Sequence, residues 1–124
     1  MISHSTAKQM AELGFPQPEP KFGQVWYTQI GNAVICSDSY RDIEYLHIEF
    51  CMPGAIIARD NTDDMVYAPT VPDIMRELDS NMSFWAGDFG FFVSDINDDQ
   101  FYDEIAEEAA AKAWIEKQRK AEVR

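Results

Sequence analysis

The longest segment with a consistent hydrophobic pattern is Phe101–Lys120, FYDEIAEEAAAKAWIEKQRK. Its apolar residues gather on one side of a helical wheel, and alanines occupy the middle of that side, so a flat surface could approach the backbone closely. Glu108 and Lys112, like Glu116 and Lys120, are four residues apart and support the outer face. The pattern predicts a C-terminal helix, and we expect the rest of the chain to supply a sheet for it.

The first half of the chain follows the two-residue period of β-strands. The runs QVWYTQI and AVICS flank Gly31-Asn32, which predicts a hairpin with a two-residue type II′ turn. A polar turn is expected at residues 37–42. Beyond it Leu46, Ile48 and Phe50 alternate with more polar residues, which predicts a strand with one buried face.

Two further helices are predicted from their start signals. A short N-terminal helix can be capped by Ser5 or Thr6. Later in the chain Thr70 occupies an N-cap position and Asp73 the capping-box position, which predicts a helix that continues to about Leu78.

The most hydrophobic part of the chain is Met82–Ser94, MSFWAGDFGFFVS. It predicts a second hairpin with Gly87-Asp88 as the turn. Because Phe91 and Phe92 are adjacent, they cannot both lie on one side of a strand. Either both faces of this hairpin are covered, or it carries an exposed apolar patch for a partner. The candidate partner-binding residues are Phe84, Trp85, Phe89 and Phe91.

Together these elements predict an α+β fold. It consists of an antiparallel meander sheet of about five or six strands, an N-terminal helix, an inserted short helix, and the C-terminal helix packed on one sheet face. The length of 124 residues suits a single domain, residues 1–124, with 1–4 and 121–124 as loose termini.

Charge narrows the range of partners. The chain has 22 acidic and 10 basic residues, a formal net charge of −12 and a sequence pI of about 4.3. This balance repels phosphate backbones and anionic membranes, so we expect no direct nucleic-acid binding and no membrane binding. The basic residues of the C-terminal cluster, Lys117, Arg119, Lys120 and Arg124, complement the negative end of the helix dipole. Two cysteines without a partner motif and the absence of a long apolar run favour a cytoplasmic location.

One strand carries a candidate acid–base group. Tyr45, His47 and Glu49 are spaced two residues apart, so their side chains share a strand face. They are candidate catalytic residues for a small hydrolase-like enzyme, and the alternative interpretation is a half-exposed polar strand face. The motifs of phosphate-binding loops, dinucleotide-binding folds, zinc proteases and serine hydrolases are absent, which favours a protein that is not an enzyme.

One segment has the spacing of calcium ligands. Asp95, Asn97 and Asp99, with Asp103 beyond, resemble the first ligands of an EF-hand loop. Position six of that loop is Gln100 instead of Gly, and position twelve is an alanine instead of Glu. The alternative is that these acids cap the C-terminal helix, where their negative charge stabilises the positive N-terminal end of the helix dipole. No cofactor is expected.

Three segments carry a resemblance to a known group. LGFPQPEPKFGQVWY at Leu13–Tyr27, YAPTVPDIMREL at Tyr67–Leu78 and EEAAAKAWI at Glu107–Ile115 resemble small uncharacterised proteins of phages and prophages, notably of gut bacteria. The resemblance covers most of the chain in order. It implies a cytoplasmic accessory protein of phage or mobile-element origin, and it assigns no role to any residue.

The leading functional hypothesis is a non-enzymatic acidic module that binds or regulates a host or phage protein. An acidic surface can compete for a basic groove on such a partner. Homodimerisation through the aromatic hairpin is compatible with this hypothesis. The alternatives are the small enzyme and a calcium-stabilised structural protein.

Overall fold

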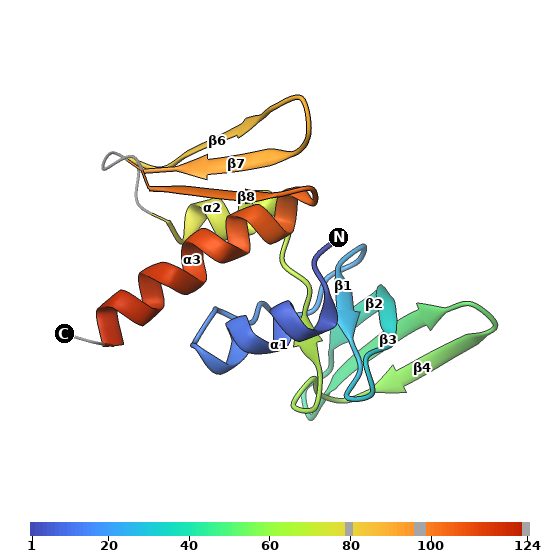
Figure 1. Ribbon diagram of the computed structural model, residues 1–124. Coiled ribbons are helices and arrows are strands. Elements are labelled where there is room, and N and C mark those ends of the chain that lie inside the picture. Colours follow the sequence, from blue (N-terminus) through green and yellow to red (C-terminus); the bar gives the residue numbers. More distant parts are fainter. Residues whose placement is uncertain (79–80, 96–98, 123–124) are drawn as a thin grey trace. The chain divides into compact units, whose positions relative to one another are not determined.

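The computed structural model describes residues 1–78, 81–95 and 99–122, and it confirms the α+β class (Figure 1). The chain forms two compact units. One comprises residues 15–68, and the other comprises 1–14 together with 69–124. The single domain predicted for residues 1–124 stays a prediction.

The unit of residues 15–68 is a five-stranded antiparallel sheet with the strand order β4-β3-β2-β1-β5. The alternation predicted around Ile48 is confirmed, because Ile48 and Phe50 are fully buried while His47 and Glu49 are half-buried. Trp26 lies at the centre of the core. The strands are β1 (Val25–Tyr27), β2 (Ala33–Arg41), β3 (Leu46–Met52), β4 (Ala55–Arg59) and β5 (Val66–Tyr67).

Two turns of this sheet differ from their predictions. The β1–β2 hairpin exists, but its loop has three residues, 29–31, closed by the Thr28 N–H donating to the Asn32 carbonyl at 2.9 Å. Gly31 is the last of them, with a φ of 92°, a geometry that suits glycine in three-residue hairpins. The polar turn expected at 37–42 is wrong. There β2 continues past a bulge at Ser37, whose hydroxyl donates to the Glu49 carbonyl, and the chain turns at residues 42–45.

The two cysteines lie on opposite faces of this sheet. Cys36 is buried opposite Phe50, whereas Cys51 stands opposite Ile35 on the other side. Both thiols are free. Burial raises the pKa of the Cys36 thiol, so Cys36 acts as a small apolar core residue.

In the part of the second unit that the structure describes, a three-stranded antiparallel sheet of strand order β6-β7-β8 combines with three helices. None of the described helices is both long enough and apolar enough to cross a membrane. The capping box predicted at Thr70 and Asp73 is confirmed. The elements are α1 (His4–Glu12), α2 (Val71–Arg76), β6 (Ser83–Ala86), β7 (Phe91–Ser94), β8 (Gln100–Asp103) and α3 (Ala106–Glu122).

The start of the C-terminal helix differs from the prediction. Residues 100–103 form β8, and α3 begins at Ala106. Phe101 and Tyr102 pair with β7, and the Asp103 carboxylate accepts the Ile105 N–H at 2.9 Å. Pairing with a neighbouring strand thus overrides a helical pattern that local sequence alone supports.

The chain's N-terminus lies against α3. The Met1 ammonium group is 3.5 Å from a Glu107 carboxylate oxygen, and the Ser3 N–H donates to Glu108 at 2.7 Å. Ile2 is fully buried. Residues 1–3 therefore make specific contacts with α3.

Candidate functional site

The three-stranded sheet has two chemically different faces, which its register defines. Phe84, Val93 and Phe101 stand opposite one another and share one face. The next residues along each strand share the other face, because side chains alternate across a strand. Those residues are Trp85, Phe92 and Tyr102, which we call the aromatic row.

One face belongs to the core of this unit. Helix α3 packs against β7 and β8, Val93 is fully buried, and Lys112 of α3 lies 2.9 Å from the Asp103 carboxylate. On this face Phe84 and Phe91 stack with ring centroids 5.8 Å apart. Burial opposes ionisation of Asp103, but the Ile105 N–H and the Lys112 ammonium outweigh it and lower its pKa.

The aromatic row covers the other face. The rings of Trp85 and Phe92 stack almost in parallel, with centroids 4.1 Å apart and planes 10° apart, and Phe92 contacts Tyr102 at 5.0 Å. The side chains of Trp85 and Tyr102 remain 42% and 40% exposed. A continuous aromatic surface thus reaches solvent across all three strands.

The polar atoms of the aromatic row are already hydrogen-bonded. Trp85 Nε1–H donates to the Ser94 hydroxyl at 3.2 Å, and the Tyr102 hydroxyl donates to the Phe89 carbonyl at 2.8 Å. These bonds fix the rings at both edges of the sheet. The row therefore offers a partner apolar and π surface more than free hydrogen-bond donors.

Two glycines make room for the rings. A Cβ atom at Gly87 would lie 2.8 Å from Phe92 Cε2, and one at Gly90 would lie 2.6 Å from Tyr102 Cε2 and 2.8 Å from the Asp103 carbonyl oxygen. Each distance is shorter than a van der Waals contact. The turn between β6 and β7 is thus matched to the row: Gly87 and Gly90 enclose Asp88 and the 87% exposed Phe89.

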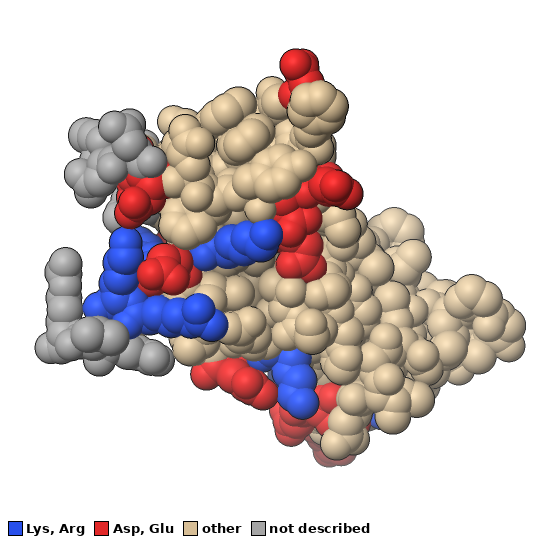
Figure 2. Space-filling view, in the orientation of Figure 1, with Lys and Arg blue, Asp and Glu red and all other residues tan. Residues whose placement is uncertain are grey.

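The surroundings of the aromatic row are acidic. Residues 77–111 contain ten Asp and Glu and no Lys or Arg. In Figure 2 the surface over β6 and β7 shows no basic residue, and the acidic residues visible there lie at its margins. Such a surface repels phosphate groups and attracts cationic ones.

The structure places the predicted partner-binding residues on both faces of this sheet. Trp85 and Phe89 are exposed, whereas Phe84 and Phe91 are half-buried on the face that α3 covers. Sequence reasoning missed Phe92 and Tyr102 as members of the row. The adjacent aromatic residues Phe101 and Tyr102, which have high β-propensity, were the signal that could have indicated a third strand.

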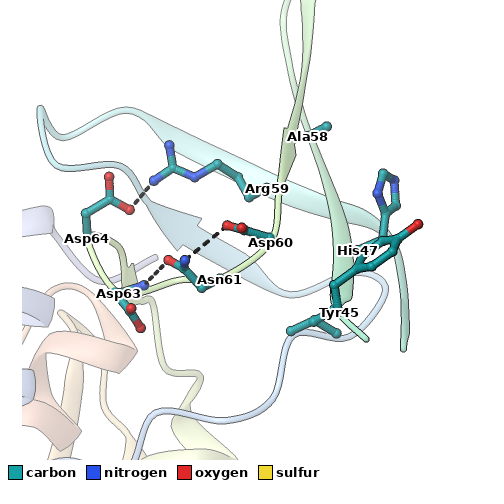
Figure 3. A pocket seen from close by; sticks show the side chains of 9 residues that line it. Tyr45, His47, Ala58, Arg59, Asp60, Asn61, Asp63 and Asp64 are labelled. Atoms are coloured by element: carbon teal, nitrogen blue, oxygen red, sulfur yellow. Dashed lines mark hydrogen bonds and ion pairs between the residues drawn. The ribbon is translucent and has the colours of Figure 1, made fainter. Parts of the chain in front are cut away.

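A second candidate site is an open cleft of about 530 Å³ in the five-stranded unit. Tyr45 and His47 lie together at one side of it, and the loop that follows β4 lies at the other (Figure 3). The remaining lining residues are Leu46, Ala58, Arg59, Asp60, Asn61, Asp63 and Asp64.

The predicted trio is partly assembled beside this cleft. His47 Nε2 lies 3.2 Å from Glu49 Oε1, and Tyr40 of β2 stacks on the His47 ring at 4.8 Å. Glu49 does not line the cleft. Tyr45, which does, is 51% exposed. The structure thus brings His47 and Glu49 together and places Tyr45 next to them.

The loop across the cleft is held by its own polar groups. Arg59 pairs with Asp64, and this hydrogen bond lowers the pKa of the Asp64 carboxyl. The Asn61 amide donates to Asp60 at 3.0 Å, and its oxygen accepts the Asp63 N–H at 3.1 Å. Figure 3 shows these contacts as two separate groups, Arg59 with Asp64 and Asn61 with Asp60 and Asp63.

The described acidic residues of the calcium-like segment contact different partners. Asp95 accepts the Asp99 N–H at 2.9 Å, Asp99 lies 3.2 Å from Lys120, and Asp103 lies in β8. Asn97 lies outside the described residues. Within residues 1–78, 81–95 and 99–122, no group of three or more His, Cys, Asp or Glu side chains is arranged to hold a metal ion.

Comparison of the chain with protein-family models, curated proteins and solved structures finds no match.

Proposed function

We propose that this chain is a non-enzymatic protein-binding or regulatory module whose binding surface is the aromatic row. The observation that carries the proposal is the row of contacting rings formed by Trp85, Phe92 and Tyr102. This row reaches solvent on the face of the sheet that α3 does not cover. Aromatic residues that reach solvent side by side are typical of protein interfaces, where Trp and Tyr contribute most of the binding free energy.

Three structural details support a binding role over incidental exposure. The rings are fixed by hydrogen bonds at both edges, so little conformational entropy is lost on binding. Gly87 and Gly90 are the residues that leave space for them. Phe89 extends the apolar surface at the tip of the hairpin.

The biological setting is part of this proposal and comes from the resemblance to phage and prophage proteins. We place the protein among accessory proteins of phage or mobile-element origin that act in a bacterial cytoplasm. The partner is then a host or phage protein. The acidic surroundings of the row favour a partner with a basic surface, and they disfavour nucleic acid.

Selection of peptides from a random display library tests this proposal. Selected peptides are expected to bind Trp85→Ala at least about tenfold more weakly than the unaltered chain, because truncation removes the largest ring of the row. The matched control is Tyr45→Ala, which removes a similarly exposed ring from the other unit. Peptides that bind both variants as well as the unaltered chain would contradict the proposal.

A second candidate function is a small hydrolase at the cleft beside His47. The observation that favours it is the His47–Glu49 contact at 3.2 Å next to an open cleft that Tyr45 lines. A histidine oriented by a carboxylate can act as a general base. Chromogenic ester and phosphomonoester substrates test this function. It predicts hydrolysis that His47→Asn abolishes and Trp85→Ala leaves intact, and hydrolysis indistinguishable from buffer would exclude these two reactions.

A further inference from the structure

The end of the three-stranded sheet nearest the β6–β7 turn carries two carboxylates that have no cation partner among the described residues. The last pairs of the sheet at this end are Ala86 with Phe91 and Phe91 with Asp103. Asp88 lies in the turn that follows Ala86, and Glu104 is the residue just after Asp103, the last residue of β8. Both acids are therefore at the same end of the sheet, and both are exposed.

Most other acids near this sheet already have partners. Asp103 pairs with Lys112, Asp99 with Lys120, and Glu107 with the N-terminal ammonium group. Among the described residues, by contrast, no cation pairs with Asp88 or Glu104. These two carboxylates are thus available to a partner at one end of the sheet, Asp88 in the β6–β7 turn and Glu104 beyond β8.

Among the described residues, no ring and no strand of this sheet stacks on the second face of the Trp85 indole, which is 42% exposed. Phe92 covers the face toward β7, whereas β6 is an edge strand, so no strand of this sheet covers the opposite face. The neighbours of Trp85 on the same side of β6 are Ser83 and Gly87, which are too small to cover it. An indole face carries a negative quadrupole, which attracts a cation placed over it.

We infer that the partner is a basic peptide segment that places an arginine side chain at the Trp85 end of the row. The inference rests on the proposed function, and it names the chemistry of the partner. The guanidinium lies over the face of Trp85 that Phe92 does not cover, beside the turn that carries Asp88. Glu104 lies at the opposite edge of the sheet, beyond β8, and matches a second basic residue of the same peptide. Arginine fits better than lysine because its planar, weakly hydrated head stacks on aromatic rings.

Other occupants match this surface less well. A nucleic acid brings phosphate groups toward unpaired carboxylates and finds the donors of Trp85 and Tyr102 already bonded. A second copy of the chain would place Asp88 and Glu104 against equally acidic surface. A neutral apolar peptide would contact the rings but leave both carboxylates without a counter-charge.

Calorimetric titration of the full chain with defined peptides tests this inference. The probes are three capped peptides in which glycine alternates with arginine, with lysine, or with citrulline, the neutral isostere of arginine. We expect the arginine peptide to bind, the lysine peptide to bind several-fold more weakly, and the citrulline peptide to bind at least about tenfold more weakly. The affinity for arginine is expected to fall as salt is raised.

Variants separate the site from the net charge of the chain. Trp85→Ala, and the double variant Asp88→Asn with Glu104→Gln, are each expected to weaken arginine-peptide binding about tenfold. The matched control is Asp42→Asn with Glu44→Gln, which removes the same charge from the exposed loop between β2 and β3 of the other unit. This control is expected to bind like the unaltered chain, and circular dichroism verifies that all variants are folded.

Three results would overturn the inference. The first is citrulline binding as tight as arginine binding, and the second is an equal loss of affinity in the loop control. The third is a dimer by light scattering that dissociates in Trp85→Ala, because the occupant would then be a second copy. If the citrulline peptide bound as tightly as the arginine peptide but Trp85→Ala still weakened binding, the inference would fail while the proposed function would still hold. The proposed function itself fails only if library-selected peptides ignore Trp85.

Discussion

Trp26→Ala is expected to lower the free energy of unfolding by about 3–5 kcal/mol, which is a large fraction of the stability of a small domain. Trp26 is fully buried, and its ring lies 5.4 Å from Tyr67 and 6.4 Å from Phe50 between centroids. Its Nε1–H donates to Gln24 at 3.1 Å. Truncation removes this packing and leaves a cavity that the strands cannot close. Urea unfolding followed by circular dichroism measures the loss.

The control for this prediction is Ile56→Ala on the same sheet. Ile56 is 69% exposed on β4, so its truncation is expected to change the free energy of unfolding by less than about 0.5 kcal/mol. A loss below about 1 kcal/mol for Trp26→Ala would mean that Trp26 is not the centre of this core.

Gly90→Ala is expected to cost about 1–3 kcal/mol through overpacking, and to disturb the aromatic row at the same time. The added methyl group would lie 2.6 Å from the Tyr102 ring and 2.8 Å from the Asp103 carbonyl oxygen. The first contact can be relieved by moving a side chain, but the second requires the backbone of β8 to shift. Urea unfolding gives the stability loss, and affinity for a library-selected peptide reports the effect on the row.

Combining Gly90→Ala with Tyr102→Ala separates the two contacts. The ring contact disappears in the double variant, whereas the contact with the Asp103 carbonyl remains. The two substitutions are therefore expected to be non-additive, with the cost of Gly90→Ala reduced but not abolished when Tyr102 is absent. Strict additivity would show that Gly90 does not provide space for the ring.

Local chemistry explains which parts of the fold the sequence predicts. The capping box of Thr70 and Asp73 forms between residues three apart, so a segment of four residues is enough to predict it. The buried face of β3 follows from the alternation of Ile48 and Phe50 with polar neighbours. In both cases the information lies within one element.

Features that depend on distant residues were not predictable in the same way. Residues 101–103 belong to the predicted helical pattern, yet with Gln100 they form β8 because pairing with β7 completes a sheet. The division of the strands into two sheets, and the bulge at Ser37, also depend on neighbours that the local pattern does not identify.

The candidate site shows the same limit. The sequence identified the hairpin and the opposed orientation of Phe91 and Phe92, because alternation along a strand requires it. It did not indicate which of the two faces α3 covers. That choice places Phe84 and Phe91 in the packed face and Trp85 on the exposed one, and it brings Tyr102 into the row.

Nuclear magnetic resonance mapping of a library-selected peptide tests most directly whether the aromatic row is the binding surface. The peptide is expected to shift the indole N–H resonance of Trp85 and the amide resonances of Phe89, Phe92 and Tyr102. Resonances of Tyr45 and His47 beside the cleft are expected to stay in place. Shifts confined to Tyr45, His47 and the loop at residues 59–64 would contradict a binding role for the row and assign binding to the cleft.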